Sequence, residues 1–363
     1  MSVPFRLEGF DHVGMIVGNA KQAAVYYQER FGFEPIAYKG LETGSREVTC
    51  HVLRQGRVLL VLETPMTPDH PHNAHLAKHG DAVKDLAFTV DDARAAFAHT
   101  TGKGARPVRE PEVLEDEHGT VVIATIATYG DTTHTFVERR GYKGDFLPGY
   151  EPRTSPKATR SCGLEFIDHV VGNQGDREME DVARWYEEIF DFHRIWTVDD
   201  KDVSTEFTSL RSVVVANENE SVKMPINEPA EGKKKSQIQE YVESNYGPGV
   251  QHVALYTKDI VETIGRLTEN GVEFLQVPDT YYEALRERVG DIDEDIRELQ
   301  KFGILVDRDD RGYLLQLFTK PVQDRPTLFY EIIERKGARS FGKGNFKALF
   351  ESIEREQALR GNL

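Results

Sequence analysis

Two stretches of the chain share the same succession of a short strand-like segment and a helix. Residues 10–13 (Phe-Asp-His-Val) precede apolar side chains at helical spacing, namely Ala20, Ala23, Ala24, Tyr27 and Phe31. Residues 167–170 (Ile-Asp-His-Val) precede a second set with that spacing, Met179, Val182, Ala183, Tyr186 and Phe190. Apolar residues three and four positions apart line one face of a helix. Each stretch therefore predicts a strand that leads into an amphipathic helix.

A second pair of similar stretches follows these helices. Residues 83–88 align with residues 250–255, and the alignment continues without a gap until Asp92 meets Asp259 and Gly104 meets Gly271. Residues 136–141 match residues 332–337 in the same way. Short apolar or β-branched runs predict strands at residues 58–62, 121–126, 211–215 and 313–318. The chain therefore reads as four copies of one module.

The repeat predicts an α+β fold in which four βαβββ modules pair into two open-barrel domains. Residues 141–161 are rich in Gly, Pro, Lys and Ser and lack apolar periodicity, which is typical of a domain boundary. We expect an N-terminal structural domain over residues 1–150 and a C-terminal catalytic domain over residues 160–363. Residues 280–302 have no counterpart in the first half, and their acidic composition predicts a solvated helix.

The end of the chain predicts one more amphipathic helix. Its apolar side chains recur at the spacing of one helix face, at Phe346, Leu349, Phe350 and Ile353. Three glycines just before it are candidate hinges, at positions 337, 342 and 344. One interpretation is a C-terminal lid helix that keeps water out of a reactive site, and the alternative is a helix that only caps the core.

Composition narrows the classes of function. The 363 residues carry 45 Lys and Arg against 61 Asp and Glu, a formal net charge of −16 that disfavours nucleic acid as a partner. No apolar run reaches the length of a membrane span, so we expect no membrane partner. The first residues carry no basic segment followed by an apolar one, and there are only two cysteines. We therefore expect a cytoplasmic protein.

Equivalent positions in the two halves can be compared with each other. His12 corresponds to His169, Asp85 to His252, and Thr135 to Glu331. Two imidazoles and one carboxylate form the facial triad that suits non-haem Fe(II), so the second half presents a candidate metal site. The first half presents a poorer set of ligands, because a threonine hydroxyl binds such an ion weakly. We therefore expect the N-terminal domain to hold no metal.

Each candidate ligand has a simpler explanation when it is taken alone. A single His in a strand is more often a hydrogen-bonded core residue than a ligand, and Glu331 would be unremarkable on an edge strand that turns it outward. The combination at equivalent strand positions favours the metal site. Another histidine cluster, His70, His72, His75 and His79, lacks an accompanying carboxylate and predicts a solvated surface helix.

Several short motifs resemble the 4-hydroxyphenylpyruvate dioxygenase family, which belongs to the vicinal oxygen chelate superfamily. The resemblance covers nearly the whole chain and is strongest in the second half. The matching stretches are residues 164–170, 209–212, 223–229, 236–240, 249–252, 319–321 and 341–346. The sequence departs from the family pattern at Ser340, where the family usually has glycine before the Phe-Gly pair.

The resemblance implies the fold of the vicinal oxygen chelate and glyoxalase proteins and Fe(II) held by His169, His252 and Glu331. It also implies polar groups around the substrate, namely Ser212, Asn227, Gln237, Gln251 and Gln316. The implied apolar walls are Pro225, Phe318, Phe341 and Phe346. A phenolic ring needs flat apolar contacts, and its hydroxyl needs a few polar partners, so this mixture is chemically consistent.

The implied reaction converts 4-hydroxyphenylpyruvate and O2 to homogentisate and CO2, a step of tyrosine and phenylalanine catabolism. The resemblance leaves hydroxymandelate synthase open, because that enzyme uses the same ligands and substrate but hydroxylates the benzylic carbon. Phe318 and residues 341–346 look more like the dioxygenase. A metal-free protein that binds small aromatic compounds is the alternative of another class. We also expect a homo-oligomer, either a dimer or a tetramer.

Overall fold

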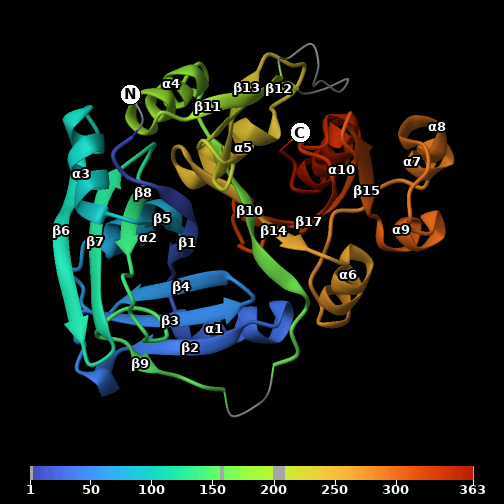
Figure 1. Cartoon of the computed structure of the whole chain (residues 1–363). Helices are drawn as coiled ribbons and strands as arrows, with labels where there is room; N and C mark the ends of the chain where they lie inside the picture. Colours follow the sequence, from blue (N-terminus) through green and yellow to red (C-terminus); the bar gives the residue numbers. More distant parts are fainter. Residues whose placement is uncertain (1–2, 156–158, 199–208, 363) are drawn as a thin grey trace.

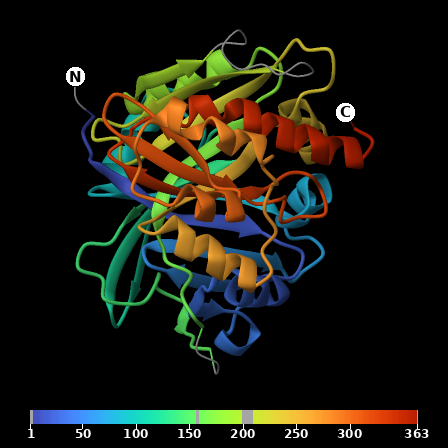
Figure 2. The ribbon, with the colours of Figure 1, turned by 90° about the vertical axis from the view of Figure 1, so that its right-hand side faces the viewer.

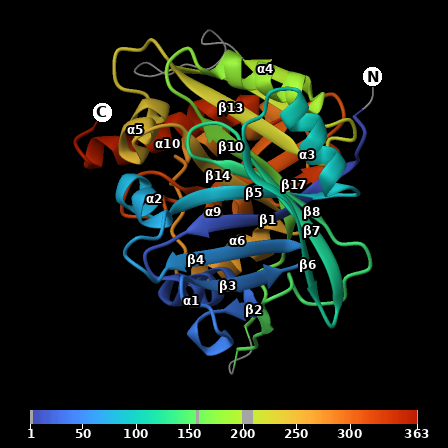
Figure 3. The same cartoon turned by 90° about the vertical axis from the view of Figure 1, so that its left-hand side faces the viewer.

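The computed structural model describes residues 3–155, 159–198 and 209–362, and its strands form two curved sheets (Figure 1). In the first described part of the chain, nine strands pair in the order β6-β7-β8-β5-β1-β4-β3-β2-β9. Their bounds are β1 (Leu7–Ile16), β2 (Glu34–Lys39), β3 (Val48–Gln55), β4 (Val58–Pro65), β5 (Ala82–Val90), β6 (Pro107–Asp116), β7 (Gly119–Ala127), β8 (Thr133–Glu138) and β9 (Glu151–Pro152). Figure 3 shows β5, β1, β4 and β3 side by side in this sheet.

The second sheet repeats this architecture. Its eight described strands pair in the order β11-β12-β13-β10-β14-β17-β16-β15. Their bounds are β10 (Leu164–Asn173), β11 (His193–Val198), β12 (Ser209–Ala216), β13 (Lys223–Ala230), β14 (Gly249–Thr257), β15 (Leu305–Arg308), β16 (Tyr313–Phe318) and β17 (Phe329–Lys336). The mixed α+β fold with two curled sheets agrees with the sequence-based prediction.

The strand registers show that the two halves are duplicates. His12 pairs with Ala87 between β1 and β5, and His169 pairs with Ala254 between β10 and β14. Asp85 pairs with Thr133 between β5 and β8, just as His252 pairs with Phe329 between β14 and β17. These are the positions that the internal sequence comparison made equivalent.

The helices cover the sheets, and the equivalent helices α3 and α6 begin at equivalent capping aspartates. Their bounds are α1 (Ala20–Phe31), α2 (His72–His79), α3 (Ala93–Gly102), α4 (Met179–Phe190), α5 (Gln237–Asn245), α6 (Ile260–Glu269), α7 (Thr280–Glu283), α8 (Leu285–Val289), α9 (Ile296–Phe302) and α10 (Phe346–Leu359). Asp92 caps α3 by accepting from the Ala95 amide at 2.9 Å, and Asp259 caps α6 by accepting from the Glu262 amide at 2.9 Å. The aspartates recur because each satisfies a free amide at a helix start.

Two sequence-based expectations about helices were wrong. Residues 280–302 form three short helices instead of one solvated helix, and they bury apolar side chains, namely Tyr282, Leu285, Val289 and Leu299. Helix α2 is not simply solvated either. The imidazole of His79 is buried and lies 2.6 Å from the Asn245 carbonyl oxygen, and His72 lies 2.5 Å from Glu63. Their partners are distant in sequence, so local composition did not reveal the burial.

One apolar core joins the two halves. Tyr27 and Phe31 of α1 contact Tyr330 of β17, and the hydroxyl groups of Tyr27 and Tyr330 are 3.0 Å apart. Both cysteines are buried free thiols. Among the described residues, no helix combines the length and apolar composition needed to cross a bilayer. β9 pairs with β2 at the edge of the first sheet and begins one residue after the predicted end of the N-terminal domain at 150, so the exact domain bounds stay a prediction.

Candidate metal centre

Three predicted ligands meet on one face of the second sheet. His169 lies opposite Ala254, and Ala254 lies opposite Glu331, so these residues form a row across β10, β14 and β17. His252 is two residues before Ala254, and side chains two positions apart in a strand share a face. All three side chains are buried. β17 lies between β14 and β16, so the edge-strand explanation for Glu331 is wrong.

The ligand atoms are spaced as neighbours around one ion. Oε2 of Glu331 lies 3.1 Å from Nε2 of His169 and 3.2 Å from Nε2 of His252. Metal bonds of about 2.0–2.2 Å to nitrogen and oxygen, at right angles, place the ligand atoms about 3 Å apart. Among the described residues, this is the group of three or more His, Cys, Asp or Glu side chains that could hold a metal ion.

Hydrogen bonds behind the histidines turn their lone pairs toward Glu331. Nδ1 of His169 is 2.7 Å from Oδ1 of Asp168, and Nδ1 of His252 is 2.9 Å from Oε1 of Gln251. Both partners are acceptors, so Nδ1 carries the proton in the neutral ring and Nε2 carries a lone pair. Three acceptor atoms then face one another at close range. This arrangement repels unless a cation lies among them, so the donor set fits a divalent metal.

The charges agree with a cation site. Burial raises the pKa of Glu331, but His169 and His252 outweigh burial and bring the pKa to about 2, so the side chain is a carboxylate. Burial lowers the pKa of His252 more than Glu331 raises it, which favours the neutral ring. Burial also lowers the pKa of His169, yet Glu331 and Asp168 raise it overall. A buried carboxylate is stable only when a positive charge compensates it.

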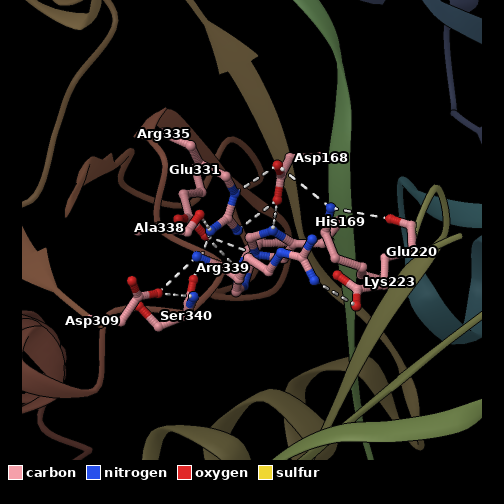
Figure 4. Close-up of polar contacts among 11 residues, drawn as sticks. Asp168, His169, Glu220, Lys223, Asp309, Glu331, Arg335, Ala338, Arg339 and Ser340 are labelled. Carbon is pink, nitrogen blue, oxygen red and sulfur yellow. Dashed lines mark hydrogen bonds and ion pairs between the residues drawn. The ribbon is translucent and has the colours of Figure 1, made fainter. Parts of the chain in front are cut away.

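A buried ionic network fixes Asp168 behind His169 (Figure 4). Arg335 donates from Nε and Nη2 to the two oxygens of Asp168, each at 2.8 Å. It also donates from Nη1 to the Ser340 carbonyl oxygen at 2.7 Å, and Lys223 lies 3.7 Å from Asp168. The sequence contained a signal for this network, because Asp precedes His in both halves and Arg139 matches Arg335. Only the ligands were identified from it.

A cavity of about 60 Å³ is lined in part by the three ligands. Most residues of the predicted substrate pocket line it, namely Ser212, Pro225, Asn227, Gln237, Gln251, Phe318, Phe341 and Phe346. Ser212 and Asn227 are paired across β12 and β13. The ring of Phe341 is 5.1 Å from that of His169, and the ring of Phe318 is 5.9 Å from that of His252.

Gln316 occupies a different place from the other predicted polar residues. It is not among the residues that line the cavity, and its side chain is buried beside Gly342. Its two amide atoms have no hydrogen-bond partner among the described residues. A Cβ atom on Gly342 would stand 2.3 Å from Nε2 of Gln316, so only glycine fits against this amide. The predicted role of Gln316 toward a substrate stays a prediction.

Other cavity residues were missed by the sequence analysis. Phe329 stacks on His252 with ring centroids 4.8 Å apart and an interplanar angle of 20°. Trp196 lies 5.7 Å from the ring of Phe346 and completes the aromatic wall. Phe329 is two residues before Glu331 and therefore shares its face, which was a usable signal. Nothing in the local sequence around Trp196 indicated its place.

The C-terminal helix α10 lies across the second sheet (Figure 2, red), and its side chains form part of the cavity wall. Phe346, Leu349 and Phe350 of α10 line the cavity, and the helix packs in an apolar cluster with Ile238, Leu275 and Phe329. Its last turn is tied to α5, because Arg360 donates to the buried carboxylate of Glu240 from Nε at 3.1 Å and from Nη2 at 2.7 Å. The predicted amphipathic helix is therefore present, and its apolar stripe faces the candidate site.

Comparisons with known proteins agree with this architecture. Residues 1–147 match the family described as "Hydroxyphenylpyruvate dioxygenase, HPPD, N-terminal", and residues 166–317 match the "Glyoxalase/Bleomycin resistance protein/Dioxygenase superfamily". A triple mutant of 4-hydroxymandelate synthase from Streptomyces coelicolor has a similar structure, with a TM-score of 0.87 and 31% identity over 97% of this chain and 99% of that one. The fold, with its two curled sheets, thus defines a member of the glyoxalase and dioxygenase superfamily.

Curated relatives narrow the class further. The chain is 53% identical to 4-hydroxyphenylpyruvate dioxygenase of Yarrowia lipolytica, over 98% of this chain and 93% of the relative. It is 55% identical to the enzyme of Danio rerio, over 98% of this chain and 92% of the relative. It is 53% identical to the enzyme of Dictyostelium discoideum, over 98% of this chain and 100% of the relative. The chain belongs to the 4-hydroxyphenylpyruvate dioxygenase family.

Proposed function

We propose that the chain holds Fe(II) between His169, His252 and Glu331 and converts 4-hydroxyphenylpyruvate and O2 to homogentisate and CO2. The observation that carries the proposal is the convergence of two imidazole lone pairs and one carboxylate oxygen at 3.1 and 3.2 Å in a buried site. When bound, Fe(II) supplies the reaction with O2 that no amino acid side chain can perform. Membership of the dioxygenase family supports the choice of metal and substrate.

The surrounding residues would bind and orient the substrate. Phe318, Phe341 and Phe346 offer flat apolar surfaces to an aromatic ring. Ser212 and Asn227, paired on neighbouring strands, offer a hydroxyl and an amide to the phenolic group. Gln237 and Gln251 add two more amides. Gln251 also orients His252, because its Oε1 accepts the proton on Nδ1 of His252. Gln316 is not among the residues that line the cavity, but it lies two positions before Phe318 on β16 and shares its face, so its proposed role toward the substrate is kept as predicted.

Helix α10 would exclude water during the reaction. Side chains of this helix form part of the wall of the cavity of about 60 Å³, and a wall that keeps water away protects reactive species. The glycine hinge before it is supported by the backbone, because Gly337 and Gly342 have φ angles of 89° and 76°, where other residues are strained. The substrate would enter when α10 moves away from α5.

Product analysis tests the proposed reaction. The protein is loaded with Fe(II) without oxygen, 4-hydroxyphenylpyruvate is added, and oxygen is then admitted. We expect homogentisate by mass spectrometry and NMR. 4-Hydroxymandelate as the main product would show that the benzylic carbon is attacked instead. The identity of 53–55% to dioxygenases, against 31% to the hydroxymandelate synthase mutant, supports ring hydroxylation.

A matched pair of variants tests the metal ligands. Glu331→Ala removes the carboxylate, so we expect loss of bound iron and of turnover, by a factor of about 10² or more, since each ligand is essential to an open three-ligand site. Thr135→Ala changes the equivalent position of the N-terminal half and should leave both the bound iron and the turnover unchanged. Iron content per chain and rate of homogentisate formation are measured. Full activity of Glu331→Ala contradicts the assignment.

The setting of the enzyme is part of the same proposal. A step of tyrosine and phenylalanine catabolism in the cytoplasm is supported by the proposed substrate and by two cysteines that remain buried free thiols. The net charge of −16 supports the expectation of a small-molecule enzyme without a nucleic acid partner. The homo-oligomer, a dimer or tetramer, stays a prediction that light scattering checks.

A further inference from the structure

The N-terminal sheet contains a second cavity at the position that corresponds to the metal centre. It measures about 370 Å³, and its lining includes His12, Asp85 and Thr135, the duplicates of the three candidate metal ligands. The strand registers make the correspondence exact to the residue, since His12 and His169 both pair with an alanine of the next strand. Much more open space is therefore available here than in the C-terminal site.

The ionic network behind the histidine is kept in this half. Nδ1 of His12 is 2.7 Å from Oδ1 of Asp11, and Arg139 donates to both oxygens of Asp11. The ring of Phe146 lies 5.2 Å from that of His12, as the ring of Phe341 lies 5.1 Å from that of His169. Burial opposes ionisation of Asp11, but His12 and Arg139 outweigh it and lower its pKa. Asp11 is thus an acceptor, and Nε2 of His12 presents a lone pair to the cavity.

Asp85 creates a gap that a metal ion fits poorly. Its Oδ2 lies 4.0 Å from Nε2 of His12, and its Oδ1 accepts from Thr133 at 2.6 Å. Neighbouring metal ligands stand about 3 Å apart, as they do in the C-terminal site. Two acceptors 4.0 Å apart instead leave room for one ammonium nitrogen at about 2.8 Å from each. Burial raises the pKa of Asp85, so a positive ligand would stabilise its ionised form.

The remaining lining includes positive charge, apolar surface and one further carboxylate, Glu63, whose Oε1 lies 2.5 Å from Nδ1 of His72. Lys84 replaces Gln251 at the equivalent position, and Arg109 comes from β6. Lys84 also donates to the Asp131 carbonyl oxygen, and Arg109 forms a long ion pair of 3.8 Å with Glu112. Phe146 contributes an aromatic wall. A ligand with both an ammonium and a carboxylate group would be matched at both of its charges.

We propose that this N-terminal cavity is a binding site for a small α-amino acid with an aromatic or apolar side chain. Its ammonium group is held between Nε2 of His12 and Oδ2 of Asp85, its carboxylate faces Lys84 and Arg109, and its side chain contacts Phe146. The site is independent of the metal centre and of the proposed reaction. It selects an amine where the C-terminal half would take the corresponding keto acid.

Calorimetric titration of the full chain tests the site. L-phenylalanine and L-tyrosine are the probes, with phenethylamine, which lacks the carboxylate, and 3-phenylpropionate, which lacks the ammonium group. We expect the amino acids to bind with a dissociation constant in the millimolar range or below, and each probe that lacks a charge to bind about tenfold or more weakly. No heat of binding with either amino acid overturns the proposal, as does 3-phenylpropionate binding as tightly.

Equivalent substitutions in the two halves locate the binding. Asp85→Asn should weaken amino acid binding about tenfold or more, because it removes a charge-assisted hydrogen bond. Glu331→Gln should leave this binding unchanged. Lys84→Gln, which installs the residue found at the equivalent second-half position, should also weaken it and provides a test if Asp85→Asn does not fold. Loss of binding in Glu331→Gln with retention in both N-terminal variants would place the ligand at the metal centre and overturn the proposal.

Discussion

Asp11 and Asp168, which precede the two equivalent histidines, each contact that histidine and an arginine. We nevertheless expect their substitution to affect iron binding differently. Asp168 holds the ring of His169, whose other nitrogen is a candidate metal ligand. Asp168→Asn should reduce iron affinity or turnover about 10–100-fold, the usual effect of losing a hydrogen-bond partner behind a ligand. Asp11→Asn makes the same change in the N-terminal half and should leave iron content unchanged. Iron content and kcat are measured, and equal effects of the two variants would contradict the role of Asp168.

At the scale of residues, the sequence predicted what the duplication made comparable. His169, His252 and Glu331 could be found because each has a matching first-half position: His12 is the same residue as His169, whereas Asp85 and Thr135 differ from His252 and Glu331. Trp196 had no such comparison, and the predicted place of Gln316 around the substrate stays a prediction. A side chain's place in a pocket depends on the curvature of the sheet and on neighbouring loops. Strand position alone does not determine it.

At the scale of elements, helix α10 is the part of the fold with the clearest expected effect on chemistry. Deleting residues after 344 removes the cavity wall formed by Leu349 and Phe350. Water would then reach the site, so oxygen consumption should exceed homogentisate formation. A shorter truncation that keeps residues 1–360 retains the helix and the ion pair between Arg360 and Glu240. In this variant, oxygen consumption should equal homogentisate formation. An oxygen electrode and product assay measure the ratio, and an unchanged ratio in the longer deletion would contradict the lid.

Periodic patterns predicted the long elements better than the short ones. Helices α1, α4 and α10 follow from apolar residues at helical spacing, since each packs one continuous face against the core. The prediction of one solvated helix over residues 280–302 was wrong because each of the three helices there is too short to display a helical period of apolar residues. Their few buried side chains, such as Leu285 and Leu299, are separated by turns and polar residues.

At the scale of the molecule, the two halves are expected to unfold together. Tyr27 of the first half and Tyr330 of the second share a buried hydrogen bond of 3.0 Å within one core. Tyr27→Phe should lower the free energy of unfolding by about 1 kcal/mol, the usual net value of such a bond. Tyr26→Phe, at the neighbouring and partly exposed position, should change it little. Urea unfolding followed by circular dichroism measures both, and two separate transitions would contradict a shared core.

The retained Asp11, His12 and Arg139 network has a consequence for how such a protein can diverge. The hydrogen bonds that orient an imidazole are present on both sheets. The two candidate ligand sets differ at two pairs of positions, Asp85 against His252 and Thr135 against Glu331. Gaining or losing a metal ligand set therefore requires exchange of two side chains at positions with the same strand register in both halves. In a duplicated fold of this kind, substitutions at the ligand positions of one half can change what that half binds, while the other half retains its own ligand set.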